Sequence, residues 1–227
     1  MIKIINQDYK DGLKDIEDKT INLIVTDPPY SFNPRGSGKN SITEKRDYLK
    51  KVSALNCCKF NPIEFLNLIK PKLKKFAGFF FCNKLLLPHY LNWTIEYKMN
   101  FDLLIMAKNN PIPTKNNHHL PDLEYIVYIR EPGTFFSKHK TFDDFRKFYL
   151  DKRRKNNLLH PAEKPLELIE RFIRVGSKEN DLIIDPFAGS GTTALAAAKN
   201  NRNFIGFEIN EDYSILANKR IAEELKT

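Results

Sequence analysis

Short apolar runs alternate with segments of helical periodicity along most of the 227-residue chain. The runs predict strands at 2–5, 21–25, 76–81, 101–106, 125–129, 182–184 and 204–207. Apolar residues at helical spacing predict helices at 62–69, 165–175, 192–199 and 212–225. Several of these strands are apolar throughout, which is typical of strands buried on both faces of a mostly parallel sheet. The pattern therefore predicts an α/β fold, a three-layer sandwich around such a sheet.

One stretch fits this alternation less well. Residues 109–157 are rich in Pro, Asn, His and basic residues, with one strand-like run inside them. We interpret them as an insertion with a recognition role, and 1–108 and 158–227 as the catalytic domain.

Positive charge is concentrated in two segments. Residues 31–60 hold seven Lys/Arg against two acids, and residues 130–164 hold ten against five, whereas residues 165–227 hold eight against ten. Clusters of this kind are typical of proteins that contact nucleic-acid phosphates, although a biased genome could produce the same lysine-rich composition.

The remaining composition excludes several classes of protein. No apolar run approaches the roughly 20 residues that cross a bilayer, and no signal peptide is visible, so we expect a cytoplasmic protein without a membrane partner. The cysteines, Cys57, Cys58 and Cys82, have neither the number of a disulfide framework nor the spacing of a zinc site. We expect reduced thiols and no metal.

The tetrapeptide Asp27-Pro28-Pro29-Tyr30 directly follows a predicted buried strand. Ligands of open α/β sheets bind at the carboxyl ends of strands, so this is a candidate site position. The two prolines stiffen the loop, which presents a carboxylate, a carbonyl and an aromatic ring. Asp27 and the Pro28 carbonyl could accept both hydrogens of an exocyclic amine, and Tyr30 could stack on its base. A Pro-Pro turn without function is the alternative.

A second candidate site follows the predicted strand at 182–184. Residues 185–193, DPFAGSGTT, read as a strand end, a tight glycine turn and a helix start. The stretch 189–194 also satisfies the G-x-G-x-x-A form of the dinucleotide fingerprint, and Glu208 after the next strand could bind a ribose in either case. Asp185 favours S-adenosylmethionine, because a carboxylate there would repel a pyrophosphate but would pair with the ammonium of a methionine moiety.

Together these segments resemble the β-class amino-methyltransferases of DNA, a circularly permuted group with a Rossmann-like sheet. In that family the amine-binding DPPY lies near the N-terminus and the cofactor-binding FxGxG near the C-terminus, as 27–30 and 187–191 do here. Residues 160–165 match the family's His-Pro-x-x-Lys-Pro element, and Asp8 follows the first strand, where relatives usually have Gly-Asp and this chain has Gln7-Asp8. The resemblance covers residues 1–108 and 158–227.

The resemblance implies a restriction-modification type of enzyme that methylates DNA with S-adenosylmethionine at a short sequence. The implied catalytic residues are Asp27, Pro28, Pro29 and Tyr30. Those implied for cofactor binding are Asp8, Lys164, Asp185, Phe187, Gly189, Ser190, Gly191, Thr192 and Glu208. The basic residues expected to contact DNA are Arg35, Lys39, Lys138, Lys140, Arg153 and Arg154.

The same resemblance implies direct transfer of the methyl group to an amine of a base flipped out of double-stranded DNA. Methylation at cytosine C5 would need a cysteine nucleophile, typically after proline, and no cysteine of the chain follows one. Asp27 at the first position of the tetrapeptide favours adenine N6. Cytosine N4 and an RNA substrate are the alternatives. A second copy of the chain and a cognate restriction endonuclease are further candidate partners.

Overall fold

The computed structural model describes residues 1–29, 60–109, 111, 119–138, 141–151 and 163–225. In this part of the chain eight strands form one sheet in the order β1-β8-β7-β2-β3-β5-β4-β6. The strands are β1 (Ile2–Asn6), β2 (Leu23–Thr26), β3 (Ala77–Cys82), β4 (Asn100–Lys108), β5 (Leu123–Arg130), β6 (Phe148–Asp151), β7 (Leu182–Asp185) and β8 (Asn203–Glu208).

The sheet is mostly parallel, as predicted. Strands β1, β8, β7, β2 and β3 all run in the same direction, and β5 is antiparallel to both of its neighbours, β3 and β4. The N-terminal strand β1 pairs with β8, so the first strand of the chain completes the half of the sheet built by its C-terminal segment. This is the arrangement expected of a permuted chain.

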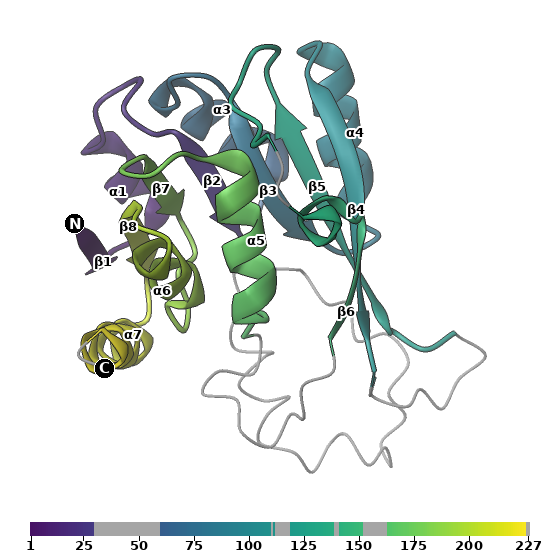
Figure 1. Ribbon diagram of the computed structural model, residues 1–227. Helices are drawn as coiled ribbons and strands as arrows, with labels where there is room; N and C mark the ends of the chain where they lie inside the picture. The colour runs from purple at the N-terminus through teal and green to yellow at the C-terminus, as the bar shows by residue number, and fades with distance from the viewer. Residues whose placement is uncertain (30–59, 110, 112–118, 139–140, 152–162, 226–227) are drawn as a thin grey trace, which may run out of the picture.

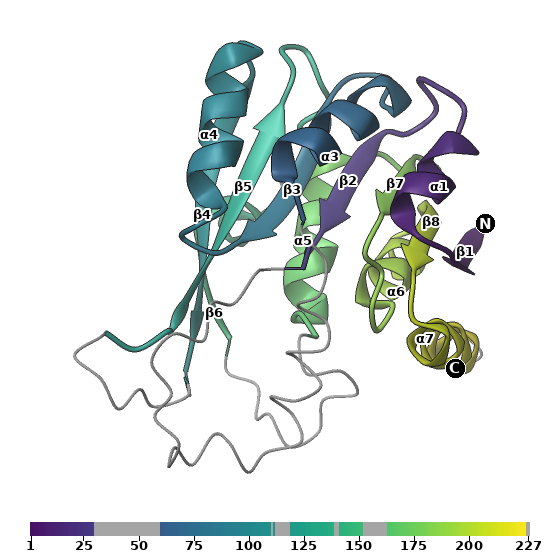
Figure 2. The same ribbon diagram turned by 180° about the vertical axis from the view of Figure 1, so that it is seen from behind.

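Helices cover both faces of the sheet (Figures 1 and 2). One face is packed by α5 (Leu166–Gly176), α6 (Thr192–Lys199) and α7 (Glu211–Glu224). The other is packed by α1 (Tyr9–Lys14), α3 (Pro62–Ile69) and α4 (Leu87–Glu96). Two short 3₁₀ helices, η2 (Lys70–Lys72) and η3 (Phe142–Phe145), complete the described elements. The predicted three-layer α/β sandwich is confirmed.

Aromatic packing joins these layers. The Phe79 ring of β3 stacks between the rings of Tyr128 on β5, at a centroid distance of 4.0 Å, and Phe172 on α5, at 4.2 Å. On the other face, Trp93 of α4 packs on Phe76 just before β3, at 4.9 Å. Ring pairs of this kind add about 0.5–1.5 kcal/mol each beyond their buried area, so they fix the helices against the centre of the sheet.

The predicted strands and helices are all present, with ends that differ by at most two residues. Two α-helices and one strand were missed, α1, α4 and β6, as were the two short 3₁₀ helices. Helix α1 has only six residues and contains Gly12, and its start is marked by Asp8, whose side chain accepts a hydrogen bond from the Lys10 backbone N–H. Neither its length nor its glycine predicts a helix, and a cap on its own is a weak signal.

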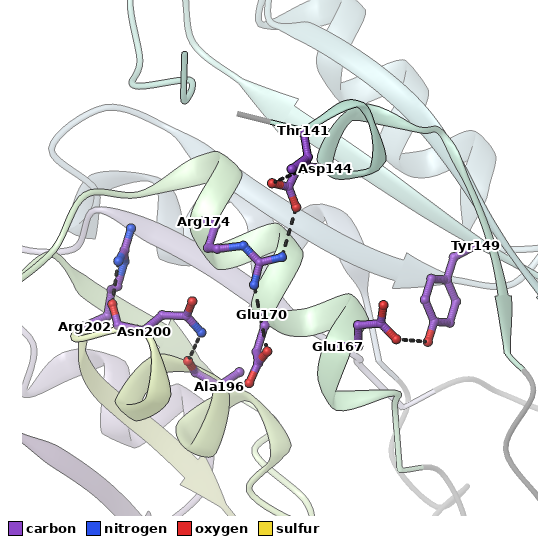
Figure 3. A network of polar contacts seen from close by, with 9 residues as sticks. All are labelled: Thr141, Asp144, Tyr149, Glu167, Glu170, Arg174, Ala196, Asn200 and Arg202. Carbon is purple, nitrogen blue, oxygen red and sulfur yellow. Dashed lines mark hydrogen bonds and ion pairs between the residues drawn. The ribbon is translucent and has the colours of Figure 1, made fainter. Parts of the chain in front are cut away.

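The described part of residues 109–157, the region predicted as an insertion, pairs with strands of the sheet and contacts α5. Its strand β5 lies inside the sheet between β3 and β4, and β6 pairs with β4. Figure 3 shows how η3 and β6 are held on α5: Arg174 donates to Asp144 at 2.9 Å, and the Tyr149 hydroxyl donates to Glu167 at 3.4 Å. Part of this region therefore belongs to the common sheet, and the assignment of 109–157 as an insertion with a recognition role stays a prediction.

No helix in the described ranges is both long and apolar enough to cross a membrane.

Candidate functional site at the sheet switch point

The site lies where the order of the strands reverses. From β2 the chain proceeds to its neighbour β3, whereas from β7 it proceeds in the other direction to β8. Because β2 and β7 are parallel neighbours, the loops that follow them leave the sheet at the same edge. The Thr26 hydroxyl at the end of β2 donates to Asp185 Oδ1 at the end of β7, at 2.7 Å. The two motifs, more than 150 residues apart, therefore begin side by side.

Asp185 is a buried carboxylate that joins three elements. Besides Thr26, it accepts hydrogen bonds from the Thr193 hydroxyl at 2.7 Å and from the Phe187 backbone N–H at 3.1 Å. Burial raises the pKa of Asp185 to about 6, against the three hydrogen bonds, and the nearby charge of Asp27 adds to the rise. Asp185 is thus a group whose charge changes close to neutral pH.

The glycine turn after β7 has the backbone of a ligand cradle. Gly189 and Gly191 have φ values of +50° and +77°, which L side chains rarely adopt. A Cβ atom added at Gly189 would meet only the Phe187 carbonyl oxygen at 3.9 Å, so this side of the turn is open. At Gly191 it would approach Ala217 Cβ at 3.1 Å, so there the glycine allows α6 to pack closely on α7. The turn is therefore open at Gly189 and tightly packed at Gly191.

Glu208 ends β8 directly beside this turn. One oxygen accepts from the Gly189 backbone N–H at 2.9 Å and the other from the Asn210 backbone N–H at 2.9 Å. Burial raises the pKa of Glu208, and these backbone donors oppose the rise. The carboxylate is half-buried, so it can still accept hydrogen bonds from a ligand's hydroxyl groups.

A group of aromatic rings borders the turn. The Phe187 ring lies 4.8 Å from the ring of Tyr9, 5.5 Å from that of Phe60 and 5.6 Å from that of Phe65. Tyr9 follows Asp8, whose half-buried side chain begins α1. Asp8 and Phe187 therefore flank one apolar surface that could pack on a planar base. Tyr9 and Phe60 were not predicted here, because rings so distant in sequence gather only through the fold.

Lys164 lies against the other motif. Its buried ammonium pairs with Asp27 Oδ2 at 2.7 Å and with Glu124 Oε2 at 2.9 Å. The same nitrogen lies 4.9 Å from the centre of the Phe81 ring. The lysine predicted for cofactor binding thus contacts the carboxylate predicted to be catalytic, and Glu124 is a charged neighbour that the sequence did not reveal.

A second unpredicted residue supports the glycine turn from α7. Arg220 donates to the Ser190 carbonyl at 3.2 Å and to the Thr192 hydroxyl at 3.4 Å. Its other terminal nitrogen pairs with Glu163 at 3.1 Å, with both side chains almost fully buried. This arginine links the segment that carries Lys164 to the turn that contains Ser190, which itself lies within 3.1 Å of the Thr192 hydroxyl.

Several predicted residues lie outside the described part of the chain. They are Tyr30, Arg35, Lys39, Lys140, Arg153 and Arg154, together with His160 and Pro161 of the His-Pro-x-x-Lys-Pro element. Of the two prolines that follow Asp27, Pro28 is buried and Pro29 is half-buried. Lys138 is exposed, in a segment held by the Ser137 backbone N–H, which donates to the Val175 carbonyl at 2.9 Å.

The chemistry available at this edge is acid–base and hydrogen-bonding chemistry. Cys82 ends β3 nearby, but it is fully buried, and burial raises the pKa of its thiol to about 12. It is therefore not a thiolate nucleophile. Within the described ranges, no three His, Cys, Asp or Glu side chains gather in a way that could hold a metal ion.

Similarity to known proteins agrees with this site. The chain is 26% identical to the type II methyltransferase M2.DpnII of Streptococcus pneumoniae, over 99% of this chain and 91% of that protein. It is 27% identical to the DNA adenine methyltransferase YhdJ of Escherichia coli strain K12, over 96% of this chain and 82% of that one. The crystal structure of M1.HpyAVI in complex with SAM matches with a TM-score of 0.69 and 26% identity, over 97% of this chain and 100% of that chain.

The model of one protein family, N6_N4_Mtase, described as DNA methylase, matches residues 21–219. The matched residues include Asp27. They also include the whole of the second motif: strand β7, the glycine turn, and strand β8 with Glu208 at its end. The chain belongs to the N6/N4 family of DNA methylases.

Proposed function

We propose that this protein methylates the exocyclic N6 of adenine within a short sequence of double-stranded DNA, with S-adenosylmethionine as methyl donor. The observation that carries the proposal is the common edge of β2 and β7, where the Thr26 hydroxyl donates to Asp185. Asp27 and the glycine turn therefore border one space, in which an amine and a methyl donor can meet.

S-adenosylmethionine is the cofactor of this methyltransferase family, and the related M1.HpyAVI is known in complex with it. The residues of this chain fit the molecule. The open side of Gly189 leaves room for it, Glu208 can accept from its ribose hydroxyls, and Asp185 can pair with its ammonium. Asp8 and the ring of Phe187 would lie on either side of its adenine.

The bound cofactor supplies an electrophilic methyl group on a sulfonium. Asp27 and the Pro28 carbonyl would accept hydrogen bonds from the two N–H groups of the target amine, which directs its lone pair out of the base plane. As the new carbon–nitrogen bond forms, the carbon–sulfur bond of the cofactor would break, S-adenosylhomocysteine would leave, and the methylated amine would release one proton to Asp27 or to water. Tyr30 would stack on the flipped base, and this contact offsets part of the few kcal/mol that extrusion costs. Most of the rate enhancement comes from positioning and from polarising the amine, because no covalent enzyme intermediate is needed.

The choice of adenine rests on Asp27 and on the relatives. The family model covers both N6 and N4 methylation, and one relative, matched over 82% of its length, is named a DNA adenine methyltransferase. The names of relatives such as M2.DpnII also support a role in restriction and modification. We propose that residues 109–157 contribute to target recognition, and that Arg35, Lys39, Lys138, Lys140, Arg153 and Arg154 contact phosphates. A cognate endonuclease, a homodimer and a cytoplasmic location belong to the same proposal.

Sequencing of DNA from a methylation-deficient host that expresses the chain tests the function directly. We expect N6-methyladenine at one short sequence, and no modification with the empty vector. N4-methylcytosine would contradict the choice of base, and unmodified DNA from cells that contain the soluble protein would contradict DNA methylation. A parallel assay with RNA oligonucleotides would reveal the alternative substrate.

A further inference from the structure

Four charged side chains meet beside the proposed amine site. Lys164 pairs with Asp27 at 2.7 Å and with Glu124 at 2.9 Å, and Lys108 pairs with the other oxygen of Glu124. They come from four separate parts of the chain: the loop after β2, the segment before α5, the start of β5 and the end of β4. None of these four side chains is more than 27% exposed, so their charges act on one another with little screening by water.

The topology explains why Glu124 reaches this site. Strand β5 is antiparallel to β3, so it begins at the edge where β2 and β3 end. The register pairs Cys82, the last residue of β3, with Tyr125, the neighbour of Glu124. Glu124 itself pairs with Met106 of β4, two residues before Lys108. Strand β5, which is antiparallel to β3 and β4, thus places the Glu124 carboxylate at the edge of the sheet where the parallel strands end.

The charges in this group balance. Burial alone would raise the pKa of Glu124, but the ammonium groups of Lys164 and Lys108 lower it to about 2. Burial would likewise lower the pKa of Lys164, but the charges of Asp27 and Glu124 raise it instead. The group therefore pairs two carboxylates, Asp27 and Glu124, with two amino groups, Lys164 and Lys108. Removing the charge of Glu124 leaves a net positive charge beside Asp27.

We propose that Glu124 is a positioning residue for methyl transfer, which holds Lys164 between two carboxylates and so keeps Asp27 a strong acceptor for the target amine. This inference rests on the proposed role of Asp27. If the Lys164 ammonium paired with Asp27 alone, its full positive charge would act against the negative charge with which Asp27 polarises the amine. Sharing the ammonium with Glu124 divides that charge, while the ion pair between Lys164 and Asp27 still holds the Asp27 carboxylate in position.

The test separates catalysis from binding in the Glu124→Gln variant, which preserves the shape of the side chain but not its charge. We expect kcat to fall about tenfold, at the low end of losses seen when an orienting partner is removed. The Kd for S-adenosylmethionine and the KM for DNA should stay within about twofold, because Glu124 contacts neither molecule in this proposal. Glu124→Asp, which retains the charge, should recover most of the loss.

Asp102→Asn is a matched control. Asp102 is also a strand carboxylate paired with a lysine, Lys147, but this pair is more exposed and lies nearer the opposite end of β4. Its kcat should equal that of the wild type. If Glu124→Gln does not fold, Glu124→Asp carries the test, with an expected loss in kcat of about threefold and unchanged Kd.

Three results would overturn the proposal: an unchanged kcat in Glu124→Gln, an equal loss of kcat in Glu124→Gln and Glu124→Asp, or a loss in which kcat and cofactor Kd change together. The wild type is measured in the same assay. Absence of methylation by the wild type would contradict the proposed function, whereas an active wild type with an equally active Glu124→Gln variant would contradict only the role of Glu124.

Discussion

Acidification should weaken the binding of S-adenosylmethionine, and Asp185 is the reason. Burial raises the pKa of this carboxyl to about 6, although Thr26, Thr193 and the Phe187 backbone N–H all donate hydrogen bonds to it. In the proposed function the ionised form pairs with the ammonium of the methionine moiety. A neutral carboxyl loses that attraction, so affinity should fall as the pH falls through about 6.

The size of the effect follows from the ionised fraction. With a pKa of about 6, nearly all molecules carry the charge at pH 8, but only about one in eleven does so at pH 5. If only the ionised form binds well, the apparent Kd rises about tenfold over this range, which corresponds to about 1.4 kcal/mol. The ammonium of the ligand keeps its charge at the acidic end, so the change reports the protein group.

Isothermal titration calorimetry of S-adenosylmethionine binding between pH 5 and pH 8 measures this dependence. Thr193→Val removes a hydrogen bond that lowers the pKa of Asp185, so the midpoint of the affinity change should move to higher pH. Thr193→Ser keeps the hydroxyl and should leave the midpoint in place. An affinity that is constant from pH 5 to pH 8, or a midpoint equal in the two variants, would refute the reasoning.

Three further variants test other parts of the account. Asp27→Ala should abolish methyl transfer and leave the Kd for S-adenosylmethionine nearly unchanged, and full activity would remove Asp27 from the mechanism. Gly191→Ala should destabilise the fold by about 1–3 kcal/mol in chemical denaturation, because φ is +77° and the new methyl would lie 3.1 Å from Ala217 Cβ; an unchanged midpoint would argue against this strain. Replacing Arg153 and Arg154 together by Ala should weaken DNA binding about equally for all sequences in a fluorescence anisotropy assay, and a changed sequence preference would contradict a phosphate-binding role.

The sequence predicted the fold well because its strands are short, apolar and separated by regular helices. The strands β2, β3 and β7 are almost entirely buried, and buried strands are recognisable without knowledge of their partners. Strand β6 has only four residues at the outer edge of the sheet, with exposed Phe148 and Leu150, so its pattern resembled a loop with scattered aromatics. Its pairing with β4 depends on the fold.

The site was predictable only in part, for a similar reason. Asp27 directly follows β2, and Asp185 and Glu208 end β7 and β8, so local order places all three at the edge of the sheet. Glu124 instead begins an antiparallel strand, and whether such a residue reaches the same edge depends on which strands it pairs with. Arg220 lies on α7, and its contacts with Ser190 and Glu163 arise from helix packing that no spacing in the sequence reveals.

A crystal structure of the protein bound to sinefungin and a DNA duplex with its recognition sequence would test the central claim most directly. The claim predicts that the cofactor analogue lies on the turn at 189–191, with its ribose at Glu208 and its amine, in the place of the methyl group, facing a flipped adenine held by Asp27. An analogue bound away from that turn, or an extruded base too far from it for a methyl group to pass between them, would contradict the claim.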